Sequence, residues 1–364
     1  MPSSTFLTRV VINNYKSIQH CDVKLGPLTF LVGRNGAGKS NFLDALQFVS
    51  DALNKTLEQA MEDRGGSSEI VHRSRSKFNA ISIELSFNLF NGSECNYSFN
   101  LRETSNGEYG VVDESCQVWD KNRKRTYFEI KNQKLDSNSC VLLPHTTDRL
   151  YLIRASEDPA IRPAYDALSN MKFYNLNPDV MTGVKHNEFS ANLTRDGSNI
   201  SSIVAKMKEQ SPETLKRVEQ YLSVILPNLK HVDVDRLNSI EMLVFYLHVT
   251  NFVEPQRFEA LSMSDGTLRS LGVLAALFQK SKKNGLQIPL IGIEEPENGL
   301  HPFAIAALYD ALMEASVTRQ IIVTTHNSDL LDRKNIDPDS ILEVASESGD
   351  THISQIDPIN KKAI

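Results

Sequence analysis

The residues 33–40 carry the most specific chemical pattern in the sequence. They form a G-x-x-x-x-G-K-S motif made of Gly33, Arg34, Asn35, Gly36, Ala37, Gly38, Lys39 and Ser40. Glycines let the backbone curl until successive N–H groups face phosphate oxygens, and the start of a helix adds its partial positive charge. Lys39 can reach the β- and γ-phosphates, and the Ser40 hydroxyl can ligate Mg²⁺. The pattern predicts a loop that binds ATP and Mg²⁺.

A pair of glutamates forms the second chemical pattern. Glu294 and Glu295 directly follow the apolar run 288–293. Ligands in open parallel sheets bind at the carboxyl ends of strands, so both carboxylates would face the loop 33–40. We expect Glu294 to hold Mg²⁺, directly or through water, and Glu295 to orient or deprotonate the attacking water. Two glutamates after a strand also suit the first turn of a helix, but the loop 33–40 favours the catalytic interpretation.

Both patterns lie at the ends of predicted strands. The apolar run 28–32 stops at Gly33, and apolar residues recur at helical spacing from Lys39 to about residue 60. The last quarter alternates between helical and apolar-strand patterns, with helices at about 267–280 and 302–315 and strands at 288–293 and 321–324. Such alternation is typical of parallel strands joined by crossover helices, so the expected fold class is α/β.

The stretch from about residue 78 to 130 has a different pattern. Apolar and polar residues alternate in short runs, and Asn91-Gly92 and Asn106-Gly107 are hairpin-turn signals. These features predict an antiparallel β meander. Other expected elements are strands at 7–12 and 18–25 around a turn at Asn13-Asn14, a mainly helical stretch at 159–225, and strands at 232–234 and 242–249.

The composition limits the class of protein. Of the 364 residues, 40% are hydrophobic and 23% charged, and the formal net charge is −6. This balance is typical of a soluble globular protein and excludes a polycation that wraps nucleic acid. No apolar run approaches the ~18 residues of a membrane-spanning helix, and the first residues show no secretory-signal pattern. The four cysteines lack metal-ligand spacing, so we expect reduced thiols in a cytoplasmic protein. Because no apolar run is long enough, we expect no membrane contact.

Four motifs stand in the order found in ATP-binding-cassette (ABC) ATPases. They are Gly33–Ser40, Leu261–Thr267, Glu294–Pro302 and Thr324–His326. The sequence resembles the SMC/RecF/OLD-like branch of these ATPases, and it is similar to the standalone AAA-family ATPases that accompany bacterial anti-phage defence systems. The segment Asn14–Ile18 also resembles the opening strand of that branch. The resemblance covers most of the chain and implies a P-loop NTPase of the ABC head type, with Walker A at 33–40 and Walker B ending at Glu294.

The resemblance implies further site residues. Ser264 and Gly266 stand where the family has the signature that caps the γ-phosphate bound to a partner protomer. His326 matches the switch histidine that contacts the γ-phosphate. ATP would then be buried between the protomers of a homodimer or higher oligomer. Without the family, Ser264 would be an ordinary helix N-cap and His326 an ordinary strand-end histidine.

Some positions depart from the family pattern. Glu294 stands where Asp is usual, Asp265 replaces the first signature glycine, and His301 occupies the place of the D-loop aspartate. The family also has a Q-loop glutamine after the Walker A helix. Neither Gln47 nor Gln59 can be assigned to this position from the sequence.

We expect a single ABC-type module over residues 1–364. Residues 1–140 would form an N-terminal lobe with Walker A and the meander, 141–240 an inserted, mainly helical lobe, and 241–364 a lobe with the signature, Walker B and the switch histidine. No heptads occur between Lys39 and Ser264, so no long coiled coil is expected. The residues after His326 are too few for the nuclease domain of OLD-type relatives.

Three functions stay open on this reading. The first is an ATP-hydrolysing switch that regulates a separate effector, a nuclease or toxin, in antiviral defence. The second is a RecF-like repair or recombination ATPase that clamps DNA, and the third is a scaffold that binds ATP with little turnover. Contact with nucleic acid also stays open, because the basic stretches 72–77 and 121–125 could touch phosphates, although the second equally suits a charged hairpin tip.

Overall fold

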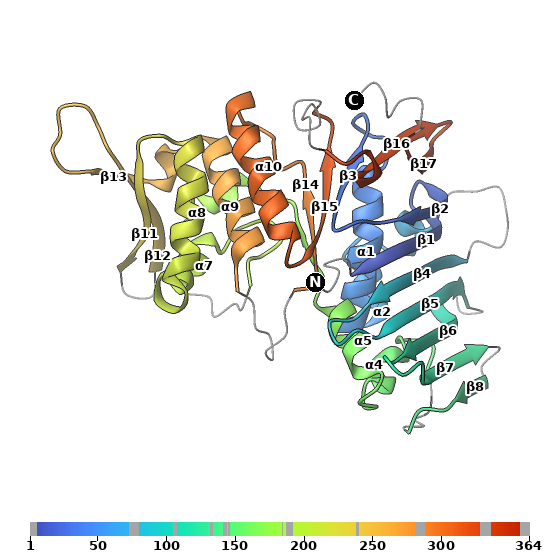
Figure 1. Ribbon diagram of the computed structural model, residues 1–364. Helices are drawn as coiled ribbons and strands as arrows, with labels where there is room; N and C mark the ends of the chain where they lie inside the picture. The colour runs from blue at the N-terminus through green and yellow to red at the C-terminus, as the bar shows by residue number, and fades with distance from the viewer. Residues whose placement is uncertain are drawn as a thin grey trace. The chain divides into compact units, whose positions relative to one another are not determined.

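The computed structural model describes the chain in several stretches (Figure 1). The described residues are 6–72, 80–104, 108–131, 134–140, 144, 146–183, 185–186, 192–237, 240–280, 288–327 and 336–356. The chain divides into two compact units. Unit 1 consists of residues 1–171, 288–290 and 337–364, and unit 2 consists of residues 172–287 and 291–336.

A seven-stranded antiparallel sheet forms much of unit 1, in the order β2-β1-β4-β5-β6-β7-β8. Its strands are β1 (Leu7–Tyr15), β2 (Ile18–Lys24), β4 (Ile81–Asn88), β5 (Glu94–Glu103), β6 (Tyr109–Trp119), β7 (Arg125–Lys131) and β8 (Lys134–Ser137). The alternating apolar residues of β4 are all buried. The predicted meander is confirmed, with Gly92 in the left-handed conformation (φ 82°) in the β4–β5 turn. The expected turn at Asn106-Gly107 lies outside the described residues.

The Walker A strand and helix also belong to unit 1. β3 (Leu28–Val32) pairs in parallel with β16 (Ile341–Glu347), which pairs with β17 (Asp350–Gln355) in the antiparallel sense. α1 (Lys39–Asn54) packs on the meander through Phe48, whose ring lies 5.8 Å from that of Tyr15 and 6.5 Å from that of Phe99. The remaining helices of unit 1 are α2 (Leu57–Glu62), α3 (Ser67–Ile70), α4 (Leu152–Ala155), α5 (Arg162–Ser169) and the 3₁₀ turn η2 (Pro338–Ser340).

Two local expectations for unit 1 are wrong. The turn between β1 and β2 lies at Lys16-Ser17 rather than at Asn13-Asn14, because Lys16 adopts a left-handed φ of 48° and its N–H donates to Ile70 O. The helix predicted to run to about residue 60 ends at Asn54. Thr56 then caps α2 in a capping box with Gln59, and this cap starts a new helix.

Unit 2 holds the Walker B strand and the helices around it. β9 (Lys172–Tyr174) pairs in parallel with β14 (Leu290–Glu294), and β15 (Gln320–Thr325) lies on the other side of β14. A second sheet has the order β10-β12-β11, with β13 paired to β12. Its strands are β10 (Lys185–His186), β11 (Leu229–Leu237), β12 (Ile240–Leu247) and β13 (Gln256–Glu259). The strands and helices expected in the last quarter of the chain are confirmed to within a few residues.

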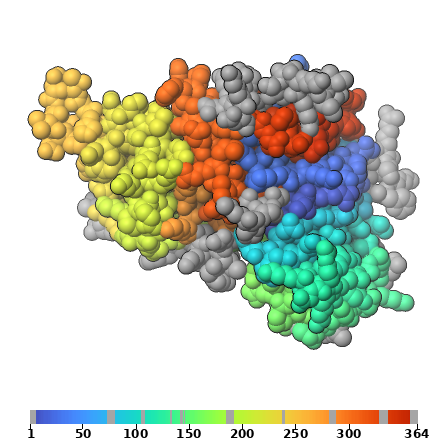
Figure 2. All heavy atoms as spheres, viewed as in Figure 1, coloured from blue at the N-terminus to red at the C-terminus, as the bar shows by residue number. Residues whose placement is uncertain are grey.

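The described helices of unit 2 have at most 15 residues. They are α6 (Pro178–Met181), α7 (Ile200–Gln210), α8 (Pro212–Ile225), η1 (Ala260–Ser262), α9 (Asp265–Phe278) and α10 (Pro302–Ser316). α8, α9 and α10 lie side by side (Figure 1), and Tyr221 of α8 stacks on Phe278 of α9. The loop between β12 and β13 projects from the rest of unit 2 (Figure 2).

The described helices exclude a long coiled coil within the part of the chain that the structure covers. The longest of them, α1, has 16 residues. Among the same residues, no helix is both long and apolar enough to cross a membrane. The expected stretch 141–240 contains α4–α8 and also β9–β11. The division of the chain at residues 140 and 240 stays a prediction.

Candidate functional site

The Walker A loop connects β3 to α1 and requires glycine at defined positions. Gly36 and Gly38 have φ values of 78° and 101°, which side chains rarely adopt. A Cβ on Gly38 would lie 2.0 Å from Thr351 Oγ1, and a Cβ on Gly33 would lie 2.1 Å from Val344 O. The loop is therefore held closely against β16 and β17, and its curled shape depends on these glycines.

Lys39 and Ser40 begin α1 directly after the loop. The Lys39 ammonium donates to Gly33 O at 2.7 Å and to Arg34 O at 3.1 Å, and the residue is only 5% exposed. Its charge therefore lies within the curl of the loop. Ser40 is exposed in the first turn of α1, and nothing lies within 4 Å of a Cβ placed on Gly36. An open, glycine-lined cradle with a lysine inside it and a helix N-terminus behind it fits a phosphate chain.

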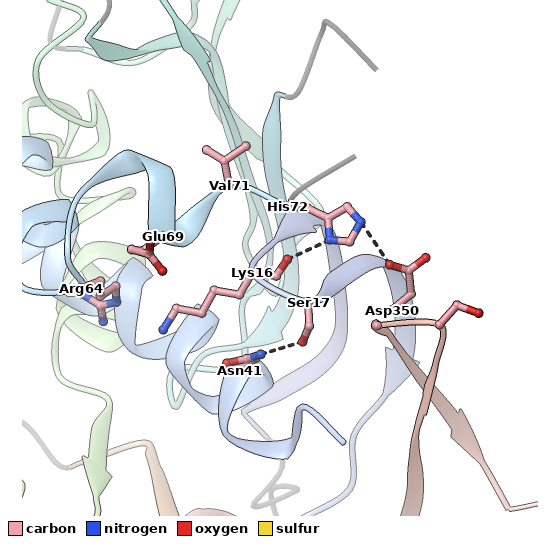
Figure 3. A pocket seen from close by; sticks show the side chains of 10 residues that line it. Lys16, Ser17, Asn41, Arg64, Glu69, Val71, His72 and Asp350 are labelled. Carbon is pink, nitrogen blue, oxygen red and sulfur yellow. Dashed lines mark hydrogen bonds and ion pairs between the residues drawn. The ribbon is translucent and has the colours of Figure 1, made fainter. Parts of the chain in front are cut away.

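A cavity of about 620 Å³ opens beside the first turn of α1 (Figure 3). Asn41, which follows Ser40, lines it and donates to Ser17 Oγ at 2.6 Å. His72 lies across from Asn41, with Nδ1 2.8 Å from Lys16 O and Nε2 3.3 Å from Asp350 Oδ1. Because a carbonyl only accepts, the Nδ1 atom carries the proton of this contact. The cavity is thus lined by polar groups with fixed positions.

Asp44 of α1 anchors two cations that line this cavity, Lys16 and Arg64. Its carboxylate lies 2.5 Å from Lys16 Nζ and 3.0 Å from Arg64 Nε, and it accepts from the Tyr15 hydroxyl at 2.7 Å. Burial alone would raise the pKa of Asp44, but the Arg64 and Lys16 cations outweigh it and hold this pKa below its ordinary value. Arg64 is also bound to Asp51 at 2.9 Å. These contacts fix the two cations relative to α1.

Glu294 and Glu295 are at the end of β14 in unit 2. Glu294 is the last residue of the strand, and its carboxylate lies 3.3 Å from the Arg195 guanidinium. Glu295 adopts a left-handed φ of 43°, a conformation that costs a non-glycine residue about 1–3 kcal/mol. Its N–H donates to Thr324 O at 3.0 Å and lies 3.1 Å from Thr324 Oγ1. The contacts with β15 hold the strained residue in place.

The Glu295 side chain points to the end of β15. Its carboxylate accepts from Asn298 Nδ2 at 2.6 Å and lies 3.4 Å from His326 Nδ1. The structure therefore brings together Glu295 and His326, which α10 and β15 separate in the sequence. Both side chains remain partly exposed, at 30% and 40%, so a water molecule can reach them.

The signature residues lie at the start of α9. Ser264 is the N-cap, and its side chain accepts from Thr267 N at 3.2 Å. A Cβ on Gly266 would lie 2.3 Å from Gly299 O, and Arg269 donates to Asn298 O at 2.7 Å. The signature segment is thus packed directly on the segment that follows Glu295. Ser264 itself is exposed.

Some residues in and next to the motifs have no role assigned from the sequence. Glu297 is buried, its carboxylate accepts from Thr325 Oγ1, and burial raises its pKa. Thr325 Oγ1 in turn accepts from Asn327 N at 3.0 Å. This chain of hydrogen bonds ties the segment after Glu295 to the residues around His326. The acidic run 294–297 and the threonine pair before His326 are the sequence signals that point to it.

The candidate residues divide between the two units. Unit 1 contains Gly33–Ser40, and unit 2 contains Glu294, Glu295, Ser264, Gly266 and His326. His301 is the N-cap of α10 in unit 2 and is exposed. Of the two basic stretches, residues 73–77 lie outside the described residues, and 121–125 form the exposed tip of the β6–β7 hairpin, where Arg123 lies 3.2 Å from Glu94.

The sequence is similar to known proteins over most of its length. The family model AAA_21, "AAA domain, putative AbiEii toxin, Type IV TA system", matches residues 28–332. The Old nuclease of Escherichia phage P2 is 23% identical over 357 residues, which cover 90% of this chain and 58% of that protein. RecF of Actinobacillus pleuropneumoniae serotype 5b is 35% identical over 65 residues, 16% of this chain and 18% of that protein. The chain thus spans less than two thirds of each of these relatives.

The fold is similar to solved SMC heads. The structure of the SmcHead bound to the C-winged helix domain of ScpA has a TM-score of 0.56 at 14% identity, covering 99% of this chain and 100% of that one. The Smc head domain bound to the C-terminal domain of ScpA from Pyrococcus furiosus has a TM-score of 0.50 at 11% identity, covering 99% and 98%. At these identities the likeness shows the fold. The chain belongs to the AAA_21 family, and its sequence and fold are similar to those of ABC-type P-loop ATPases of the SMC/RecF/OLD branch.

Proposed function

We propose that the protein binds ATP with Mg²⁺, dimerises around the nucleotide and hydrolyses it. In this proposal the ATP cycle is a switch that regulates a partner effector, a nuclease or toxin, in a bacterial anti-phage defence complex. The observation that carries the proposal is the Walker A loop, in which the Lys39 ammonium lies inside the glycine curl while Arg34, Asn35 and Gly36 are exposed.

Unit 1 offers room for the rest of the nucleotide beside this loop. The cavity of about 620 Å³ has the size of an ordinary small-molecule pocket, roughly 300–1,000 Å³. Asn41 and His72 present polar groups to it, and the Lys16 ammonium brings a positive charge that Asp44 holds in place. We assign the phosphates to the loop 33–40 and the nucleoside end to this cavity.

Ser40 and Glu294 are the residues that would hold Mg²⁺. A hydroxyl and a carboxylate are oxygen ligands of the kind that Mg²⁺ prefers, with the other positions left to phosphate and water. When bound, Mg²⁺ neutralises phosphate charge.

Glu295 and His326 are the residues proposed for the chemical step. The Glu295 carboxylate would accept a proton from the attacking water, since it is partly exposed and oriented by Asn298 and His326. The hydrogen bonds of the Glu295 N–H with Thr324 fix the backbone beneath the carboxylate. His326 would donate to the γ-phosphate or hold Glu295, depending on which ring nitrogen carries its proton.

The proposal that ATP is shared between two protomers is supported by the exposed start of α9. Ser264 and Asp265 are exposed, although Gly266 behind them is buried. Among the exposed large apolar side chains of unit 2 are Leu261, at 77% exposure, and Phe303, at 70%. Leu261 precedes the signature and Phe303 follows His301, so both flank the segments assigned to the shared site. Exposed apolar residues of this kind suit a surface that a second protomer covers.

The choice of an effector-linked role comes from the relatives. The family description names a toxin system, and the relative that spans most of this chain is a phage nuclease. A RecF-like clamp on DNA is the alternative, favoured by the local match to RecF. A scaffold with little turnover is the third, and the replacement of the usual Walker B aspartate by Glu294 is the observation that favours it.

Purification of the full chain with and without its operon neighbours tests the proposal. We expect ATP hydrolysis by the wild type, measured as phosphate release, and loss of nucleotide binding in Lys39→Ala. Lys208→Ala, which removes a surface lysine paired with Asp233, is the matched control and should behave as wild type. An effector that co-purifies in an ATP-dependent way supports the switch. Salt-dependent DNA binding without such a partner would favour the RecF-like clamp, and tight ATP binding without turnover would favour the scaffold.

A further inference from the structure

Arg195 contacts the carboxylate of Glu294, the last residue of the Walker B strand. Its Nη2 atom lies 3.3 Å from Glu294 Oε1, although the two residues are 99 positions apart in the sequence. The Glu294 side chain is only 15% exposed, and the Arg195 side chain is 48% exposed. The guanidinium therefore covers the carboxylate from the solvent side.

The backbone of Arg195 is fixed beside β14. Asn175 N donates to Arg195 O at 2.9 Å, and Asn177 N donates to Asp196 O at 3.0 Å. Asn175 directly follows β9, whose last residue Tyr174 is in register with Ile293 of β14. Because the two strands run in parallel, the residue after Tyr174 lies beside Glu294. The pairing of the arginine with Glu294 thus follows from the strand register.

The turn that carries Arg195 is rigid. Asn199 is 1% exposed, accepts from Thr194 N at 2.9 Å and donates to Asn192 O at 3.0 Å. Gly197 has a φ of 80° and packs on Leu176 and Met181. Because the backbone is held at both ends, only the side-chain rotamers of Arg195 remain to be fixed when it pairs with Glu294.

We propose that Arg195 is a positioning residue for Glu294: it neutralises and holds this carboxylate when no metal is bound, and a divalent cation that binds Glu294 must displace it. This inference rests on the proposed function, because it takes Glu294 as the metal carboxylate. A guanidinium and a divalent cation on the same carboxylate repel each other at close range. Since half of the Arg195 side chain is exposed, it can swing into solvent while its backbone stays in place.

The test is the affinity of the nucleotide-free full chain for Mn²⁺, measured from the electron paramagnetic resonance signal of the free ion. We expect Arg195→Ala to bind Mn²⁺ about tenfold more tightly than the wild type, because the competing cation is gone. Arg195→Lys keeps a positive charge and should lie between the two. Arg257→Ala, which removes a comparably exposed arginine paired with Asp235, should match the wild type.

Glu294→Gln identifies the carboxylate responsible. In the double variant with Arg195→Ala, the gain in Mn²⁺ affinity should disappear. Equal Mn²⁺ affinities of wild type and Arg195→Ala, a gain that survives Glu294→Gln, or no Mn²⁺ binding by Arg195→Ala would each overturn the inference. Arg195→Met, which retains the aliphatic stem, replaces Arg195→Ala if the latter does not fold. Because no nucleotide is present, a protein that fails to bind ATP would contradict the proposed function and leave this test decisive.

Discussion

Glu114 is the residue that joins the meander of unit 1 to the start of α4. It lies on β6 at 1% exposure, and its carboxylate accepts from Tyr151 N at 2.6 Å, from Leu152 N at 2.8 Å and from the Tyr97 hydroxyl at 3.0 Å. Burial raises the pKa of Glu114 to about 7, and the three donors limit this rise. The folded protein therefore binds a proton at Glu114 more tightly than the unfolded chain does.

The raised pKa gives a testable pH dependence. Between the unfolded value of about 4.5 and the folded value of about 7, the native state holds more protons, so the free energy of unfolding falls as the pH rises. Glu114→Gln cannot titrate and removes this contribution. We expect the stability of the wild type relative to Glu114→Gln to decrease by roughly 2.5 kcal/mol from pH 5 to pH 8 in urea denaturation. A difference that stays constant over this pH range would show that the carboxyl does not titrate there.

At the residue scale, the sequence predicts those site residues that lie within local motifs. Lys39 and Ser40 follow a glycine pattern, and Glu294 and Glu295 follow an apolar strand. The left-handed conformation of Glu295 was not predictable, because it depends on hydrogen bonds to Thr324. Arg195 was missed for the same reason. Its meeting with Glu294 depends on the register of β9 and β14, which no local pattern reports.

At the scale of elements, the strand–loop–helix of Walker A depends on close approach as well as on backbone conformation. Gly36 and Gly38 both have positive φ values, but only Gly38 is covered by Thr351. Thr351 is itself held by hydrogen bonds to Ala37 O at 2.9 Å and to Ser17 O at 2.7 Å. The loop is therefore supported by β17, a strand far away in the sequence.

Alanine at the two positions separates the two effects. Gly36→Ala should cost about 1 kcal/mol of stability, because it brings only the strain of a positive φ. Gly38→Ala should cost about 2–4 kcal/mol, because the added Cβ also overlaps Thr351. Chemical denaturation of the nucleotide-free variants measures both. Equal losses would mean that β17 does not press on the loop.

The elements themselves show which local signals can be read from a sequence. Periodicity predicts β3, α9, α10 and β15 to within a few residues, because buried elements carry regular apolar patterns. The break after Asn54 was missed, although Thr56 and Gln59 form a capping box, because the apolar spacing continues through it. The β1–β2 turn was predicted at Asn13-Asn14 because two asparagines are typical of turns. The hydrogen bond from Lys16 N to Ile70 O places it at Lys16-Ser17 instead.

At the scale of the whole molecule, we predict that two protomers share each catalytic site. Lys39→Ala removes the phosphate contact of one protomer, and Ser264→Arg blocks closure of the signature by bulk and opposes the helix dipole with added charge. Each variant alone should be inactive. In a mixed dimer one site takes both changes and the other takes neither, so part of the ATPase activity should return, up to about half per mixed dimer.

Mixing the two purified variants in the presence of ATP measures this restoration. The formation of heterodimers is verified independently with differently tagged chains. Zero activity in a mixture that contains demonstrated heterodimers would argue against the shared site. It would favour a scaffold or a site that a different protein completes.

We propose that this chain hydrolyses ATP with Glu295 as the base. The rate at which the Glu295→Gln variant releases phosphate at saturating ATP is the measurement that decides this. We expect a rate at least ~100-fold below that of the wild type, the scale of losing a general base, with ATP binding retained in the same sample. Glu259→Gln, a change at an exposed glutamate paired with Arg257, should leave the rate unchanged. An undiminished rate of phosphate release in Glu295→Gln would show that Glu295 is not the base.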